Sequence, residues 1–191
     1  MQGRGIEKKH IITITGDHAS GQGTLSNNLQ KELGYEIYRN GQYVRKLASE
    51  KGMTINEFQV YLNEHPNLDK EIEKSATIYA NNHDNLIIDA KLGWYAVPES
   101  FKVYLKVDIE VAVDRAFNDA ARKNTEPYAT KEEAREKILY RHKEETTRWL
   151  DTYGVNRDDM TNYDLVLDTT DLTPEEVCNR VIEAYEKWLK N

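Results

Sequence analysis

The chain has 191 residues, enough for one domain of ordinary size, and its formal charge of −7 argues against a nucleic-acid-binding surface. Its single cysteine, Cys178, excludes an intramolecular disulfide and favours a reducing compartment. Because no apolar run approaches the roughly 18 residues that span a bilayer, and because the charged segment 1–10 does not resemble a signal peptide, we predict a cytoplasmic chain with no membrane partner.

A strand, a loop rich in small residues and a helix open the chain. The β-branched run Ile11–Thr15 predicts a buried strand of a parallel sheet. Leucines recur at helical spacing over residues 25–33, and Gly34 suits the end of that helix. The loop between them, residues 16–24, contains three glycines.

The rest of the chain alternates between strand and helix patterns. Thr54 and Thr130 each have a glutamate three residues further on, as in a capping box, and Thr173 precedes a first-turn proline. The expected strands are 35–39, 86–89, 101–107 and 164–168, and the expected helices are several within 42–80, broken at 65–67, and one each over 109–122, 131–153 and 174–190. This alternation predicts an α/β fold with helices around a mostly parallel sheet.

The loop after the first strand has the spacing of a phosphate-binding loop. Gly16 and Gly21 match the glycines of G-x-x-x-x-G-K-[ST], in which backbone N–H groups and a helix N-terminus hold phosphates. The lysine position is Gln22, however, and the hydroxyl is delayed to Thr24. A charge-assisted hydrogen bond is about twice as strong as a neutral one. We therefore expect the loop to bind phosphate more weakly, while its backbone N–H groups still contribute.

The alternative for this loop is a glycine-rich turn that only joins a strand to a helix, but its place after the first strand favours phosphate binding. His18 lies where such loops vary, and we expect its side chain to be exposed to solvent. The five histidines show no metal-ligand spacing, so no zinc site is predicted.

A nucleotide would need positive charge from elsewhere, and arginines flank the polar segment 123–130. Arg115 and Arg122 share one face of the preceding helix, while Arg141 and Arg148 share a face of the following one. Two such helices could close as a lid over phosphates. The alternative is that these arginines form ordinary surface ion pairs.

Three more polar residues are expected near the C-terminal edge of the sheet, where open α/β sheets bind their ligands. Arg45 follows the second strand, and Lys91 lies two residues beyond the strand-terminal Asp89. Asp89 could hold Mg²⁺ through water or hydrogen-bond a sugar or base. The alternatives are a surface position for either basic residue and a turn role for Asp89.

Several short segments occur in a specific order: Ile12-Thr13-Ile14-Thr15-Gly16, Ser20-Gly21, Arg45-Lys46-Leu47-Ala48, Gly52-Met53, Glu57-Phe58, Leu92-Gly93-Trp94, Tyr104-Leu105-Lys106, Tyr153-Gly154-Val155 and Tyr163-Asp164-Leu165-Val166-Leu167-Asp168-Thr169. In that order they resemble the archaeal-type cytidylate kinases, which belong to the nucleoside monophosphate kinases among the P-loop proteins. The resemblance covers nearly the whole chain.

The resemblance implies a P-loop kinase fold, a three-layer sandwich with a helical lid, formed by one domain over 1–191. It places an acceptor-binding helical region at about 40–80 and the lid at about 122–141. The implied reaction is transfer of the γ-phosphoryl group of ATP, with Mg²⁺, to CMP or dCMP. No metal ligand is assigned, and a monomer or weak homodimer is expected.

Residue by residue, the resemblance implies three groups of site residues. The ATP phosphates would bind at Gly16, Asp17, His18, Ala19, Ser20, Gly21, Gln22, Gly23 and Thr24. Catalytic roles would fall to Lys91, Arg122, Arg141 and Arg148. The acceptor would contact Asn40, Arg45, Asp89 and Glu145.

The chain departs from the family pattern at four of these positions. Gln22 replaces the loop lysine, Ala19 replaces a glycine, Lys91 replaces an arginine, and Asn40 stands where a serine or threonine is usual. These changes leave two alternatives to an efficient cytidylate kinase. One is a nucleotide-binding homologue with impaired catalysis that acts as a sensor or partner, and the other is a kinase for another small acceptor.

Overall fold

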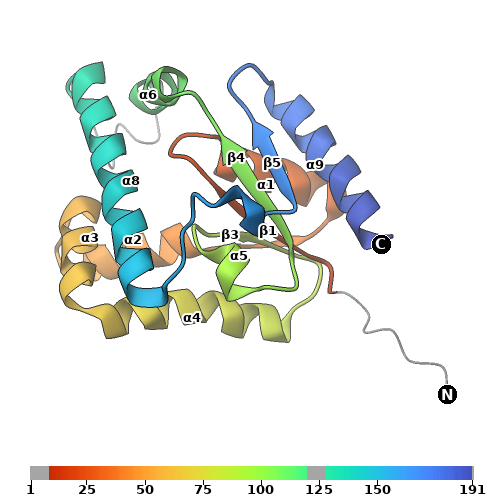
Figure 1. Ribbon diagram of the computed structural model, residues 1–191, viewed down its shortest axis with the longest axis horizontal. Coiled ribbons are helices and arrows are strands. Elements are labelled where there is room, and N and C mark those ends of the chain that lie inside the picture. The colour runs from red at the N-terminus through yellow and green to blue at the C-terminus, as the bar shows by residue number, and fades with distance from the viewer. Residues whose placement is uncertain (1–8, 120–127, 191) are drawn as a thin grey trace.

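A five-stranded parallel sheet forms the centre of the protein. The computed structural model describes residues 9–119 and 128–190. The strands are β1 (Ile11–Gly16), β2 (Glu36–Arg39), β3 (Leu86–Asp89), β4 (Phe101–Lys106) and β5 (Leu165–Asp168). They lie in the order β2-β3-β1-β4-β5, and every neighbouring pair is parallel (Figure 1). The predicted α/β fold class is confirmed, and each strand lies within two residues of its expected bounds.

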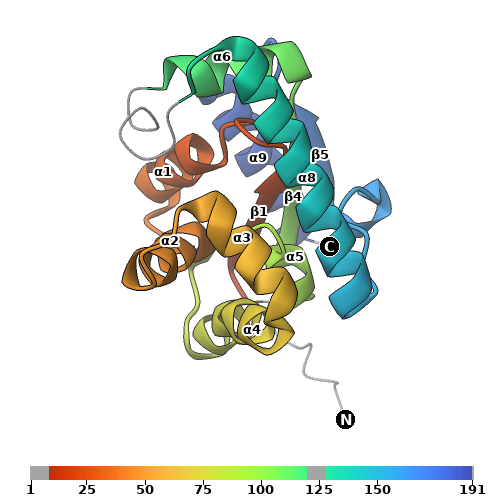
Figure 2. The same ribbon diagram turned by 90° about the vertical axis from the view of Figure 1, so that its left-hand side faces the viewer.

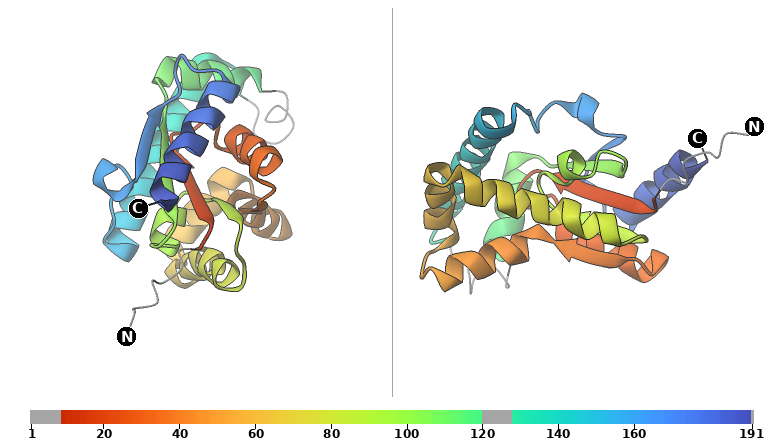
Figure 3. Two further views of the ribbon diagram at one scale, coloured as in Figure 1. Left: turned by 90° about the vertical axis from the view of Figure 1, so that its right-hand side faces the viewer. Right: turned by 90° about the horizontal axis from the view of Figure 1, so that it is seen from below.

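Two helices cover one face of the sheet. They are α1 (Gln22–Leu33) and α9 (Pro174–Leu189), which lie side by side in Figure 3. Their apolar faces join the inward side chains of β1 and β4 in the largest core cluster, which includes Leu29, Val103 and Val181. The first turn of α9 has the proline and the Thr173 capping box that its sequence indicates.

The opposite face of the sheet is covered by α4 (Pro66–Asn82), a short helix α5 (Gly93–Ala96) and the C-terminal half of α8 (Lys131–Tyr153). α4 packs on β1 and β3 through Ala76 and Ala80. Trp149 of α8 packs with Trp94 and Tyr104 in a second cluster on this side. Sheet and helices therefore form three layers.

Three helices form the region between residues 40 and 82. They are α2 (Asn40–Glu50), α3 (Ile55–Glu64) and α4, and they enclose a small core of their own, which contains Phe58 and Ile72 (Figure 2). The capping box at Thr54 is present, and α3 and α4 are separated at His65 as the sequence predicts. This region also contacts α8.

The helix pair that precedes and follows residues 120–127 packs through alanine and β-branched side chains. α6 (Ile109–Asn118) ends four residues before its predicted end, because Asp119 adopts extended backbone. α8 has the predicted bounds, and the Thr130 hydroxyl caps it, but the Glu133 carboxylate accepts from the Ala129 N–H, so the predicted capping box is only half formed. Arg122 and most of the polar segment 123–130 lie outside the described residues.

Each helix in the described ranges is too short or too polar to cross a bilayer.

Candidate active site

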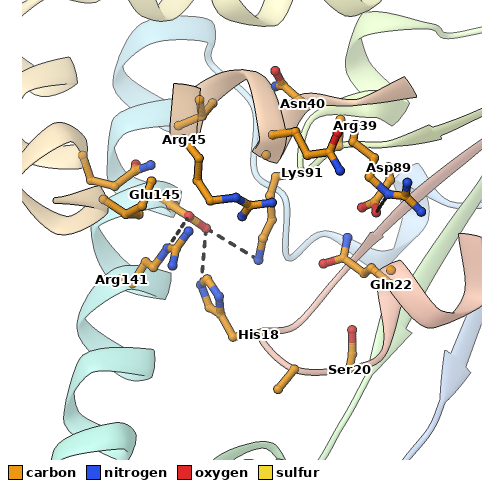
Figure 4. A pocket seen from close by; sticks show the side chains of 18 of the residues that line it. His18, Ser20, Gln22, Arg39, Asn40, Arg45, Asp89, Lys91, Arg141 and Glu145 are labelled. Atoms are coloured by element: carbon orange, nitrogen blue, oxygen red, sulfur yellow. Dashed lines mark hydrogen bonds and ion pairs between the residues drawn. The ribbon is translucent and has the colours of Figure 1, made fainter. Parts of the chain in front are cut away.

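A cleft of about 1040 Å³ opens at the C-terminal edge of the sheet. It lies among the loop after β1, the residues after β3 and parts of α2, α4 and α8 (Figure 4). The predicted site residues that line it are His18, Ala19, Ser20, Gly21, Gln22, Gly23, Thr24, Asn40, Arg45, Asp89, Lys91, Arg141, Glu145 and Arg148. These predicted residues come from four separate segments of the chain, and the fold brings them to one cavity.

The start of the loop is tied to β4. A Cβ atom at Gly16 would lie 2.5 Å from the Leu105 carbonyl oxygen and 2.7 Å from Ser20 Oγ, so only glycine fits there. The Asp17 carboxylate accepts hydrogen bonds from the Tyr104 hydroxyl (2.7 Å) and the Val107 N–H (3.0 Å). Gly16 and Asp17 therefore attach the start of the loop to β4 and the residue after it, and they are not among the residues that line the cleft.

The end of the loop presents hydrogen-bond donors to the cleft. Gly21 caps α1 with φ of 96°, and no side chain caps this terminus. The first N–H groups of a helix have no partner within the helix, and those of α1 belong to residues that line the cleft. Ser20 Oγ is buried without a hydrogen-bond partner among the described residues. This uncapped cradle fits a phosphate group.

Ala19 and Gln22, which depart from the family pattern, each change the loop locally. Ala19 has φ of 60°, in the left-handed region that costs a non-glycine residue roughly 1–2 kcal/mol. The Gln22 amide nitrogen donates to the Ile14 carbonyl at 3.2 Å. Position 22 therefore brings a neutral side chain that is bonded to the β1 backbone.

Glu145 is the centre of a buried charge cluster. It is 3% exposed, and its carboxylate lies 3.3 Å from Arg141 Nε, 3.4 Å from an Arg157 guanidinium nitrogen, 3.5 Å from His18 Nε2 and 3.7 Å from Lys91 Nζ. Burial acts to raise its pKa, but Lys91 and the other bases hold the pKa well below its ordinary value. The guanidinium groups of Arg141 and Arg157 and the ammonium of Lys91 thus surround one carboxylate, which leaves an excess of positive charge beside this part of the cleft.

The expectation that His18 is exposed is wrong. Its side chain is 7% exposed and turns beneath α8 toward Glu145, as Figure 4 shows. Burial and the nearby Lys91 lower the pKa of His18 to about 3. The imidazole is therefore neutral, and it fills the space between the loop and α8.

Lys91 reaches the loop from the neighbouring strand. Its ammonium nitrogen donates to the Gly16 carbonyl at 3.2 Å and lies 3.7 Å from Glu145. Burial lowers its pKa to about 7, while Glu145 acts to raise it. An anion in the cleft would favour the protonated ammonium.

Arg157 is a site residue that the sequence reasoning missed. It is fully buried, lies 5.7 Å from the Trp149 ring and contacts Glu145, Asp158 and His142. Its position just after the Tyr153-Gly154-Val155 segment was the available signal, but a single arginine in a loop has no periodicity to mark it as buried.

Arg148 lies against the acceptor-side helices. Its Nε atom is 3.2 Å from an Asp69 carboxylate oxygen, and another guanidinium nitrogen donates to Gln59 at 2.8 Å. The Tyr153 hydroxyl donates to the other oxygen of Asp69 at 2.8 Å. Asp69 and Gln59 were also missed by the sequence reasoning, and they fix Arg148 between α8 and the 40–82 region.

Two acidic side chains stand near the start of α2. Asn40 donates to Glu73 at 3.4 Å, and burial together with nearby Asp69 raises the pKa of Glu73 to about 8. Asp89 lies 3.7 Å from Arg39, its neighbour in the parallel register of β2 and β3. Burial raises the pKa of Asp89, and Arg39 opposes that rise.

The remaining arginines differ in their surroundings. Arg45 is exposed at the rim of the cleft. Arg115 donates to the Thr169 carbonyl at 2.7 Å and to the Thr169 hydroxyl at 3.2 Å, so it holds the end of β5 rather than a surface carboxylate. No three carboxylate, imidazole or thiol groups within 9–119 and 128–190 converge as a metal-binding set.

Comparison with known proteins agrees with this architecture. The profile of the cytidylate kinase-like family matches residues 11–171. A cytidylate kinase from Pyrococcus abyssi is 34% identical over 168 residues, which cover 87% of this chain and 88% of that protein. One from Thermoplasma volcanium is 34% identical, with 92% of this chain and 93% of that protein covered.

A longer relative carries a different name. An S-adenosylmethionine-dependent nucleotide dehydratase from Lacinutrix mariniflava is 38% identical over 180 residues, which cover 94% of this chain and 36% of that protein. The chain thus spans little more than a third of that relative. Among solved structures, shikimate kinase from Bacteroides thetaiotaomicron superposes with a TM-score of 0.63 at 15% identity, covering 92% of this chain and 98% of that one. The likeness shows a P-loop kinase fold.

Proposed function

The chain belongs to the cytidylate kinase-like family, and from that premise we propose that it transfers the γ-phosphoryl group of ATP to a nucleoside monophosphate, with CMP or dCMP as the acceptor. The observation that carries the proposal is the meeting, in one cleft, of an uncapped glycine loop and a buried excess of basic groups. Phosphoryl transfer depends on positioning and on electrostatic stabilisation of the transferring group. The glycine loop and the basic groups of this cleft support the proposal on both counts.

The two substrates would lie at opposite ends of the cleft. ATP phosphates would bind the N–H groups of the loop and the first turn of α1, which Ser20 and Gly21 shape. The acceptor would lie toward Asn40 and Arg45 of α2, and Figure 4 shows Asn40 on the opposite side of the drawn residues from Ser20. An oxygen of the acceptor phosphate would then attack the γ-phosphorus in line.

In this reaction the new bond joins the acceptor oxygen to the γ-phosphorus, and the bond from that phosphorus to the β,γ-bridging oxygen breaks, so that ADP leaves. No covalent enzyme intermediate is formed. Lys91 and Arg141 would spread the charge that develops on the transferring group. Mg²⁺ bound with the ATP phosphates would supply further positive charge.

A second candidate follows from the relative in Lacinutrix mariniflava and from the departures in the loop. Its name describes a nucleotide dehydratase, and a segment similar to this chain makes up part of it. The chain could therefore serve as a nucleotide-binding unit with impaired transfer, alongside such a reaction. Gln22 and Ala19 favour this candidate because both weaken the loop relative to the family pattern.

A coupled assay of ADP formation separates the two candidates. We expect turnover with ATP, Mg²⁺ and CMP or dCMP, and much lower turnover with UMP, AMP, GMP or shikimate. Calorimetric titration of the same protein with ATP provides a readout that does not depend on transfer. Binding of ATP without turnover on any acceptor would reject the kinase proposal and support the nucleotide-binding unit.

A further inference from the structure

We propose that Lys91 supplies to the ATP phosphates the positive charge that the loop lacks at Gln22. The inference rests on the proposed function, since it assigns a specific role to Lys91 within the same cleft. Family resemblance alone places Lys91 at the position of an arginine, and the sequence leaves open whether Lys91 or the lid arginines replace the missing loop lysine. The structure distinguishes Lys91 by its position from Arg141 and Arg148, whereas Arg122 lies outside the described residues.

The parallel register places Lys91 level with the loop. Ile14 of β1 pairs with Asp89 of β3, so Gly16 and Lys91 each lie two residues beyond the same register pair. The Thr15 hydroxyl lies 3.2 Å from the Ala90 and Lys91 carbonyl oxygens. The backbone that carries Lys91 is therefore held directly beside the backbone that begins the loop.

The side chain of Lys91 completes this approach. Its ammonium donates to the Gly16 carbonyl, and Figure 4 shows it projecting toward the space between His18 and Gln22. The Gln22 side-chain amide meanwhile donates to the Ile14 carbonyl, two residues before Gly16. The positive charge of Lys91 therefore reaches the loop from the end of β3. Gln22, at the usual lysine position, is neutral and is hydrogen-bonded to β1.

The other basic residues of the cleft have different settings. Arg148 contacts Asp69 and Gln59 on the acceptor side, and Arg45 lies at the exposed rim. Arg141 comes from the face of α8 and pairs with Glu145. Lys91 donates a hydrogen bond to the loop backbone itself, at Gly16.

The chemistry of lysine suits this role. An ammonium is a compact point charge that can sit inside a ring of phosphate oxygens, whereas the guanidinium fork of an arginine favours planar, two-point contacts. Relative to the family pattern, this chain lacks the positive charge at position 22 and keeps one at position 91, so the single ammonium of Lys91 would contact the phosphates that the missing loop lysine would otherwise bind. Glu145, 3.7 Å away, would act as the counterion that keeps the ammonium in place.

Charge relocation tests the proposal. Four proteins are compared: the natural chain, Lys91→Met, Gln22→Lys and the double variant, with ATP affinity measured by calorimetry. We expect Lys91→Met to weaken ATP binding roughly 100-fold, and the double variant to regain about tenfold or more of that loss. Gln22→Lys alone should gain only a few-fold, because the charge is already present. Lys187→Met, on an exposed position of α9, is the matched control and should bind ATP normally.

ATP binding can be measured without phosphoryl transfer. The four affinities therefore test the role of Lys91 separately from the proposed kinase activity. If the natural chain binds ATP but turns over no acceptor, the proposed function fails while the affinities still decide the role of Lys91. Unchanged ATP binding in a folded Lys91→Met variant would overturn the inference. So would a folded double variant that regains nothing.

A measurement on the natural chain covers the case in which Lys91→Met does not fold. The rate of reductive methylation of Lys91 is followed by mass spectrometry with ATP and Mg²⁺, with CMP, or with neither. We expect ATP to slow labelling of Lys91 at least several-fold and CMP alone to have little effect. Protection by CMP and not by ATP would assign Lys91 to the acceptor and reject the proposal.

Discussion

At the scale of single residues, two buried groups show how local contacts set the chemistry of the cleft. Glu145 is ionised in the interior because basic side chains surround it, whereas Glu73 has an acidic neighbour and one amide donor and is therefore held neutral near pH 7. Two glutamates of one cleft thus carry different charges, and their surroundings decide which.

The raised pKa of Glu73 predicts a pH-dependent stability. Its pKa rises from the ordinary 4.5 to about 8 on folding, so folded Glu73 binds more protons between these values and its contribution to stability falls as pH rises through that range. Lys91, whose pKa is lowered to about 7, acts in the opposite direction above that pH, both in the natural chain and in a Glu73→Gln variant. Above the folded pKa of Glu73 the loss is complete, at roughly 3–5 kcal/mol for a fully buried group. Glu73→Gln should flatten this decline, which urea unfolding at about pH 5 and about pH 9 measures. Parallel curves for the two proteins would contradict the assignment.

Gly16 offers a second test at this scale. A methyl group there would meet the Leu105 carbonyl oxygen at 2.5 Å, so Gly16→Ala should lower the free energy of unfolding by roughly 1–3 kcal/mol. Gly23→Ala is the matched control, because no atom lies within 4 Å of its Cβ position and alanine favours a helix by roughly 0.5–1 kcal/mol. Chemical denaturation of both variants gives the comparison. Equal effects of the two substitutions would show that the close approach at Gly16 can relax.

At the scale of elements, the Arg148–Asp69 pair joins α8 to α4. Both side chains are buried, so removal of Arg148 leaves a carboxylate without its counterion. We expect Arg148→Ala to cost about 3 kcal/mol of stability. A double variant with Asp69→Ala should cost less than the sum of the two single variants, with a coupling on the order of 1–3 kcal/mol.

An exposed pair on α9 provides the control for this cycle. Lys187 and Glu183 are 69% and 68% exposed, and their coupling should be about 0.5 kcal/mol or less. Both cycles are measured by urea unfolding. A coupling for Arg148 and Asp69 as small as that of the exposed pair would show that α8 does not depend on this contact.

The elements themselves could be predicted from the sequence to a large extent. The caps at Thr54, Thr130 and Thr173 are confirmed, because a hydroxyl and the N–H groups it bonds lie within three residues. Helix α5 was not predicted, since four residues are too few to show a period. The 109–122 prediction was too long because helical spacing continues past the residue at which the chain turns.

At the scale of the whole molecule, the charge distribution reconciles an acidic chain with a phosphate-binding proposal. The net charge of −7 describes the protein as a whole. The basic side chains that line the cleft are few and come from separate segments, among them Lys91 and Arg141, while buried Arg157 lies behind them against Glu145. A small anionic ligand would therefore meet basic side chains inside the cleft, although the chain as a whole carries net negative charge.

The sequence by itself determined the order of strands and helices, the phosphate-type loop and the family. These depend on periodicity, capping and motifs, and each of those signals involves residues that are close together in the sequence. The surroundings of the site residues were decided by the tertiary structure: the burial of His18, the insertion of Arg157, the docking of Arg148 on Asp69 and the reach of Lys91 to Gly16. Each of these contacts joins separate elements of the fold. The contact of Lys91 with Gly16, for example, depends on the parallel pairing of β1 with β3, which a pattern of neighbouring residues does not specify.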